Sequence, residues 1–241
     1  MLRSKSTVFG LIAAMLVMTV VFTATSSDGT SAVTAGGHDA FIVVNGEGVS
    51  ETEFDARVAT VEQNVVRLIA QAEAAPEGAA LAESMLEIMT NTPAETIALA
   101  SVILDLSLYQ EAVARGHQPD PEPIARQVEQ EREMFEMIEA DPEHFGVPET
   151  EVERYRDRVD EIGEDAYWNE YLPQLIEQQQ AVGQFQSLVD QSDWFDIQRS
   201  VFFEASVEFA DAGAVAPATV DAAGEYLDSV WTVYLEESVG S

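Results

Sequence analysis

The chain has 241 residues, of which 46% are hydrophobic, and a formal net charge of -33. Apart from Arg3 and Lys5, its basic residues are nine arginines, which stand against 44 carboxylates. This balance argues against nucleic acid or an anionic membrane surface as a partner, since both are bound by clusters of Lys and Arg. We expect a surface adapted to high salt, which screens self-repulsion; the alternative is that the acidity serves solubility alone.

The N-terminal segment has the pattern of an export signal. Positive charges at Arg3 and Lys5 precede an uncharged apolar run of 17 residues from Val8 to Ala24, and small polar residues follow. Because this run is close to the shortest length that spans a membrane, residues 1–26 are predicted to be either a signal peptide or an N-terminal anchor. Residues 27–39, rich in Ser, Thr and Gly, are expected to be a flexible linker that leads to a body outside the cytoplasm.

The expected folded part opens on "FIVVNGEGVSETEF", residues 41–54. "FIVV" predicts a short strand, which stops at the turn signal Asn45-Gly46. Ser50 and Glu53 form a capping box, in which each side chain bonds to the backbone amide of the other residue, so a helix is predicted to begin here. The helix is expected to end before Pro76. Its apolar positions at helical spacing are Phe54, Val58, Val61, Val65, Leu68 and Ile69.

Two further helices are predicted in the first half of the chain. Residues 77–90 form the first of them. Pro93 opens the second, which is the most apolar helix of the chain, and Gly116 is a suitable residue to end it. We expect this second helix to form the core.

The second half of the chain predicts three helices separated by proline signals. "PDPEP" at 119–123 starts one helix, and "DPEHFGVP" at 141–148 breaks it. Residues 149–163 predict an acidic helix, and residues 164–191 a long one that Pro173 should kink or split. The acidic helix carries three arginines that are expected on a salt-bridged solvent face: Arg154, Arg156 and Arg158.

After Trp194 the pattern changes. In "SVFFEASVEFAD" apolar residues alternate with mostly polar ones, which is the period of a strand, although helical spacing also fits. If residues 201–209 form a strand, its expected partner is "FIVV", because a lone strand leaves its backbone groups unpaired. A final helix is predicted from about Ala218 to Glu237. The fold class is therefore mostly α, with a small β element.

The order of these motifs resembles the N-terminal chaperone domain of the SurA, PrsA and trigger-factor-like foldases. The opening of that domain is matched by "VNGE" at 44–47 together with Val49, Ser50, Glu53 and Phe54. "EAVARG" at 111–116 and "YWNEY" at 167–171 match later motifs. The resemblance implies a helical domain over residues 40–195 that holds unfolded or partly folded polypeptides, with residues 196–241 completing it.

Family members often carry a parvulin prolyl-isomerase domain after this body. Only 46 residues follow position 195, which is too few for that domain. The histidine pair of parvulin is also missing there, since the three histidines are His38, His117 and His144. We therefore expect no enzymatic activity; a foldase relic with residual isomerase activity is a weaker alternative.

Patterns for other chemistry are weak. Asp141, Glu143 and His144 could bind a divalent cation, but one histidine in an acidic loop is more often part of a solvated turn, so we expect no metal. The sequence contains no G-x-S-x-G elbow and no phosphate-binding glycine loop. Neither a cofactor nor a small-molecule substrate is predicted. Because the chain has no cysteine, thiolate catalysis and disulfides are excluded.

Four methionines remain after the export segment, in two pairs at helical spacing. Methionine is flexible and polarizable, which suits a surface that accepts varied apolar partners, yet such pairs more often fill a core. The same two alternatives apply to the aromatic residues of "YWNEY". The candidate peptide-binding residues are Met85, Leu86, Met89, Met134, Phe135, Met137, Ile138, Tyr167, Trp168 and Tyr171.

The sequence thus predicts an exported, chaperone-like protein. Its expected partners are unfolded or nascent secreted polypeptides, bound through an apolar groove. The alternative is a structural or assembly partner of one dedicated cell-surface protein.

Overall fold

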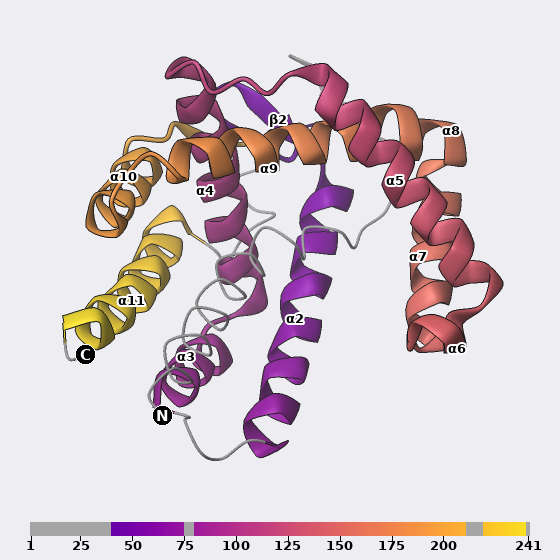
Figure 1. Ribbon diagram of the computed structural model, residues 1–241. Coiled ribbons are helices and arrows are strands. Elements are labelled where there is room, and N and C mark those ends of the chain that lie inside the picture. Colours follow the sequence, from indigo (N-terminus) through magenta and orange to yellow (C-terminus); the bar gives the residue numbers. More distant parts are fainter. Residues whose placement is uncertain (1–39, 75–79, 211–218, 240–241) are drawn as a thin grey trace, which may run out of the picture. The chain divides into compact units, whose positions relative to one another are not determined.

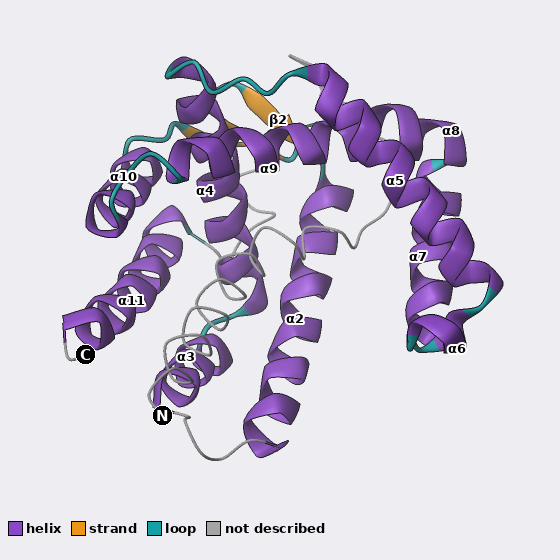
Figure 2. Cartoon of the chain, in the orientation of Figure 1, coloured by secondary structure: helices purple, strands orange, loops and turns teal. Residues whose placement is uncertain are grey.

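The computed structural model describes residues 40–74, 80–210 and 219–239 (Figure 1). The predicted export segment and linker lie outside these residues. The fold is mostly helical with a small three-stranded antiparallel sheet, which confirms the predicted fold class (Figure 2). The chain divides into two compact units: within the described residues, unit 1 comprises Phe54–Asp105 and the part that follows from Phe209, and unit 2 comprises the part before Phe54 and Leu106–Glu208.

The sheet of unit 2 begins with a hairpin. β1 (Ile42–Val44) pairs with β2 (Glu47–Val49), so that Ile42 lies opposite Val49. Between them, Asn45 and Gly46 have φ angles of +51° and +89°, the left-handed conformations that an Asn-Gly turn supplies. The predicted strand and turn are confirmed. β2 is not predicted from the sequence, because three residues with a glycine at their centre are too short to show a strand period.

The third strand, β3 (Val207–Phe209), lies beside β1, so the strand order is β2-β1-β3. Asn45 joins the two strands: its backbone N–H donates to the carbonyl of Ser206 at 2.8 Å, and its side-chain oxygen accepts from the N–H of Ser206 at 2.8 Å. The pairing of this strand with "FIVV" is therefore confirmed.

The predicted length of the third strand is wrong, because Val201 and Phe203 belong to helix α10 (Gln191–Phe203). Trp194, Phe195 and Phe202 supply the buried face of that helix. Phe195, Gln198 and Phe202 are 7%, 7% and 1% exposed at positions i, i+3 and i+7, which is the burial of a helix that turns one face inward.

Unit 1 is helical. It contains α2 (Glu51–Ala74) from Phe54 onward, α3 (Ala80–Asn91), the first half of α4 (Ala94–Ala114) and α11 (Val220–Val239). α3 packs against α11. The predicted second and last helices are confirmed apart from residues 77–79 and 218, which lie outside the described residues.

α2 begins at the predicted capping box. The N–H of Ser50 donates to Glu53 Oε2 at 2.8 Å, and the N–H of Glu53 donates to Ser50 Oγ at 3.2 Å. Two backbone donors that the first helical turn leaves unsatisfied are thereby bonded. This reciprocal pair explains why the helix starts here.

α4 is the predicted core helix, and an almost unbroken series of its side chains is buried: Ile97, Ala98, Leu99, Ala100, Val102, Ile103 and Leu104. It is also the one helix in the described part of the chain that is long and apolar enough to cross a membrane, but 56% of its most apolar window is buried within the protein. After the helix ends, Gly116 has a φ of +87° and its N–H donates to the carbonyl of Val113 at 2.9 Å. The predicted end at this glycine is therefore correct.

An ion pair joins α2 to α4 within unit 1. Arg57 Nη1 donates to Asp105 Oδ2 at 2.7 Å and to Ser101 Oγ at 3.3 Å. The side chains of Arg57 and Asp105 are only 23% and 18% exposed. Burial raises the pKa of Asp105 above its ordinary value, while the positive charge of Arg57 opposes that rise. Arg57 is thus what makes an ionised carboxylate tolerable at this position.

Replacing Arg57 with Met should lower the free energy of unfolding at pH about 7 by about 2 kcal/mol, between the costs typical of exposed and of buried pairs. The pKa of Asp105 is higher in the folded state than in the unfolded state. Protonation of Asp105 therefore stabilises the fold, fully at a pH below the pKa of the unfolded state, and this contribution is lost as the pH rises through the pKa of the folded state. The cost of Arg57→Met should therefore shrink as the pH falls toward about 4.5. Urea unfolding at both pH values measures it.

The control is the same substitution in an Asp105→Asn background, where no carboxylate remains to be left without its cation. There Arg57→Met should cost well under about 1 kcal/mol at either pH. An equal cost in both backgrounds would show that Arg57 acts through packing alone.

The helices of unit 2 follow the proline signals. They are the second half of α4, α5 (Pro121–Ala140), α6 (Pro142–Phe145), α7 (Glu149–Ile162), α8 (Glu164–Ala166), a π-helix η1 (Tyr167–Tyr171), α9 (Leu172–Gln186) and α10. α5 and α7 lie side by side with α6 at their far end (Figure 1). We call these three helices, residues 121–162, the arm.

The interruption predicted at Pro173 takes the form of the π-helix. The N–H of Leu172 donates to the carbonyl of Tyr167, five residues back, directly before the proline. Proline has no N–H to donate, and its ring collides with the carbonyl four residues earlier in a regular helix. The wider turn of the π-helix removes this conflict. The regular hydrogen-bond pattern is interrupted at η1, and the helix continues beyond it as α9.

Candidate functional site

Aromatic side chains hold the arm together. The ring of Phe135 in α5 stacks on that of Tyr155 in α7, with centroids 4.3 Å apart. The hydroxyl of Tyr167 donates to the hydroxyl of Tyr155 at 2.9 Å. Burial raises the pKa of both hydroxyls, so both stay protonated and this hydrogen bond is kept across the ordinary pH range.

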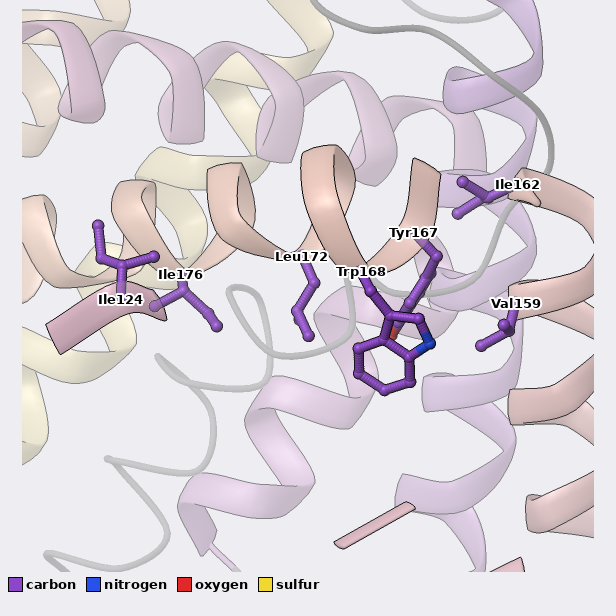
Figure 3. Packing of buried hydrophobic residues seen from close by; sticks show 7 residues of the cluster. All are labelled: Ile124, Val159, Ile162, Tyr167, Trp168, Leu172 and Ile176. Carbon is purple, nitrogen blue, oxygen red and sulfur yellow. The ribbon is translucent and has the colours of Figure 1, made fainter. Parts of the chain in front are cut away.

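The arm meets η1 and α9 in an apolar cluster formed by Ile124, Val159, Ile162, Tyr167, Trp168, Leu172 and Ile176. Figure 3 shows Tyr167, Trp168, Leu172 and Ile176 projecting from one side of the same helix. Tyr167 and Trp168 are 2% and 5% exposed. Tyr171 is partly buried and packs against the cluster. These three predicted peptide-binding residues therefore pack in or against the core, which is the alternative that the sequence left open.

The three arginines of α7 do not share one environment. Arg156 is paired with Glu139 of α5 at 2.7 Å on the surface, as predicted. The prediction is wrong for Arg158, which is 9% exposed and lies over the ring of Tyr171 at 5.8 Å. Its guanidinium faces the aromatic side of the arm, where a flat delocalised cation stacks well on a ring. The side chain of Arg154 is outside the described part of the structure.

The two methionine pairs also differ. Met85 and Met89 of α3 are 3% and 9% exposed and fill the interior of unit 1, with Leu86 partly buried beside them. Met134 and Met137 of α5, in unit 2, are 44% and 48% exposed. The structure thus separates the predicted set into an interior part on α3 and a surface part on the arm.

α5 presents three faces. Ile124, Val128 and Phe135 pack into the apolar cluster. A carboxylate face is formed by Glu122, Glu129, Glu133 and Glu136. Between these two faces lies a stripe of five uncharged residues, with Arg126 at its start and Glu131 along one edge. The five are Gln127, Gln130, Met134, Met137 and Ile138. Such a stripe stands out because α5 carries six glutamates in 20 residues.

α9 covers only the near end of this stripe. The amide of Gln180 in α9 donates to Gln127 Oε1 at 3.0 Å. Beyond it, Gln130, Met134 and Met137 are exposed, while Ile138 and Phe135 are partly buried. We call Gln130, Met134, Met137 and Ile138 the methionine flank. Of the predicted set, Met134 and Met137 are exposed on this flank and Ile138 is partly exposed; Gln130 is not among the predicted residues.

The far end of the arm adds another apolar side chain. Phe145 in α6 is 40% exposed and makes an edge-to-face contact with His144 at 5.1 Å. Phe145 is not among the predicted residues; the signal that points to it is an aromatic residue inside the otherwise polar break "DPEHFGVP". Asp141 caps α6, since its Oδ1 accepts from the N–H of His144 at 3.3 Å. Within the described residues, no group of three His, Asp or Glu side chains could hold a metal ion.

Unit 2 also has an open pocket of about 360 Å³ between the end of α4 and α10. Its lining residues are Glu111, Arg115, Asp193, Asp196, Ile197, Ser200 and Val201. Arg115 is held by Glu111 at 2.7 Å and lies over the ring of Phe185 at 4.8 Å. Ser200 in this lining donates to Glu204 Oε1 at 2.8 Å, one helical turn further on and directly after the end of α10.

Comparison of the chain with protein-family models, with curated proteins and with solved structures finds no match. Membership of the SurA-like chaperone family therefore stays a prediction from the order of the sequence motifs. The candidate site rests on the burial and charge pattern of α5.

Met85→Ala should lower the free energy of unfolding by about 3 kcal/mol, because it leaves a cavity in the interior. Met134→Ala should change it by less than about 0.5 kcal/mol, because nearly half of that side chain is already in water. Urea unfolding of the two variants measures the difference. Equal losses would show that Met134 is part of the core.

Proposed function

We propose that this protein is an exported, chaperone-like binder of unfolded or partly folded secreted polypeptides, and that it holds them on the methionine flank without a cofactor. The observation that carries this proposal is the exposure of Met134 and Met137, 44% and 48%, on an uncharged stripe of a glutamate-rich helix. Methionine adapts its shape to different apolar side chains, so one surface serves many sequences. The export signal and the resemblance to SurA-like domains support the same function.

The arm is suited to reversible holding. Full burial of a methionine or phenylalanine contributes about 1.5–3 kcal/mol, and the flank and Phe145 are already half covered, so each adds about 1 kcal/mol on contact. A single bound segment then has a dissociation constant in about the millimolar range. A chain with several apolar segments rebinds before it diffuses away, whereas a folded protein that has buried those segments is released.

The acidic surface assists such a function. A client that exposes apolar residues tends to associate with other unfolded chains. Bound to a protein of net charge -33, it would share a strong like-charge repulsion that keeps the complexes apart. Salt screens this repulsion in part but strengthens the apolar contacts between the protein and its client. Binding of the client would therefore continue at high salt, where the large net charge still opposes association.

The test is suppression of aggregation of two unrelated denatured proteins by the protein recovered from the exported fraction of an expression host. Met134→Glu combined with Met137→Glu should raise the concentration needed for half suppression roughly thirtyfold, because two apolar contacts of about 1 kcal/mol each are lost. Circular dichroism should show unchanged helicity, since both side chains are exposed.

The matched control is Val66→Glu combined with Leu188→Glu. These residues are 67% and 72% exposed and lie outside the arm, so the control makes the same two apolar-to-acidic changes. It should leave suppression unchanged. Equal loss in both variants would show that added charge, and not the methionine flank, matters. A folded protein that protects neither client would favour the alternative, a partner dedicated to one cell-surface protein.

The proposed adaptation to salt has its own test. Raising the sodium chloride concentration from about 0.1 M to about 1 M shortens the screening length from about 10 Å to about 3 Å, which should raise the melting temperature by several degrees. Sucrose at equal osmolality is the control, because it is excluded from the protein surface but does not screen charge. A melting temperature that does not depend on salt would mean that the acidity serves solubility alone.

A further inference from the structure

We infer that the segment held by the methionine flank is cationic as well as apolar: the arm selects polypeptide stretches in which Lys or Arg residues flank a few apolar ones. This inference rests on the proposed function and specifies its substrate class. It follows from the charges that border the flank.

Carboxylates border the methionine flank on both of its long sides and at its end. Glu133 lies one residue before Met134 and four before Met137, and Glu131 lies on the opposite side, next to Ile138 in the helical projection. At the end of the arm, Asp141 and Glu143 follow. These four carboxylate side chains are all exposed.

Two of the arginines in the described part of the arm are engaged with other groups. Arg132 is paired with Glu136 at 3.6 Å and Glu164 at 3.3 Å, and its guanidinium lies over the ring of Trp168 at 5.8 Å. Arg156 is paired with Glu139. Within the described side chains, no ion pair involves Glu129, Glu133 or Glu143.

The remaining arginine of α5, Arg126, lies at the start of the flank, one helical turn before Gln130. Arg126 precedes Glu133 by two helical turns, about 10 Å along the axis. That separation is close to one screening length at moderate salt, so its charge compensates Glu133 only weakly. Among the described side chains, the carboxylates around Met134 and Met137 are therefore largely uncompensated.

This border discriminates between possible occupants. A second copy of the chain brings another net charge of -33 and is repelled. A neutral apolar segment gains the methionine contacts alone, and an acidic one faces like charge. A segment with Lys or Arg beside its apolar residues gains both kinds of contact. Each exposed ion pair changes an affinity by roughly 1.5- to 5-fold, so two or three together give roughly tenfold.

The experiment uses three labelled peptides that share one apolar centre and differ in their flanking residues, which are Lys, Gln or Glu. Fluorescence anisotropy with the exported full chain measures each dissociation constant at about 0.15 M and about 1 M salt. At the lower salt the Lys peptide should bind roughly tenfold more tightly than the Gln peptide, and the Glu peptide more weakly than both. At the higher salt the Lys and Gln peptides should differ by less than about threefold, because screening removes most of the ionic contribution.

Variants locate the selectivity. Glu131→Gln, Glu133→Gln and Glu143→Gln in one chain should remove most of the preference for Lys over Gln while leaving the affinity for the Gln peptide unchanged. The matched control is Glu62→Gln, Glu83→Gln and Glu87→Gln, three exposed glutamates of α2 and α3. It changes the net charge equally and should keep the preference.

The outcomes distinguish the two proposals. If no peptide binds, or if Met134→Glu with Met137→Glu leaves binding intact, the proposed function fails. If the Lys and Gln peptides bind equally at low salt and both depend on the methionines, the arm holds apolar segments without regard to charge, and this inference alone is overturned. Equal loss of preference in both glutamine variants would also overturn it, since net charge would then account for the selectivity.

Discussion

The constraint on which the rest of the structure depends is the shortage of cations. Nine arginines follow residue 26, and four of them lie at a helix junction or over an aromatic ring. Arg57 joins α2 to α4, Arg115 lies over Phe185, Arg132 over Trp168 and Arg158 over Tyr171. A guanidinium in such a place contributes packing as well as charge. The outer surface is left anionic, so cohesion must come from apolar and aromatic contacts inside each unit.

Features specified by neighbouring residues could be predicted from the sequence. The capping box at Ser50, the Asn45-Gly46 turn and the end of α4 at Gly116 each follow from a few adjacent side chains and their backbone preferences. The limit between α10 and β3 could not be predicted, because strand and helix periods fit the same apolar residues. Burial of Phe195, Gln198 and Phe202 at helical spacing identifies the helix, and that burial depends on what the rest of unit 2 packs against it.

The candidate site shows the same limit. In sequence the two methionine pairs look alike, and only the tertiary neighbours distinguish them: α11 packs against the helix of Met85 and Met89, while α9 stops short of Met134 and Met137. Likewise Arg156 and Arg158 stand two residues apart in an acidic helix, yet one reaches the surface and the other the aromatic cluster. Helical spacing predicts which residues share a face, whereas burial decides whether that face is open to a partner.

The bonds of Asn45 have a consequence for how the chain acquires this structure. Its side chain donates to Gln110 at 2.9 Å and accepts from Ser206 at 2.8 Å, contacts that span 65 and 161 residues of sequence. β1 therefore cannot complete its sheet until the chain as far as β3 is available. During synthesis, which proceeds from the N-terminus, one edge of β1 stays unpaired until β3 has been made. Contacts of such long range make closure of the sheet a late and slow event in folding, since the intervening chain must be ordered first.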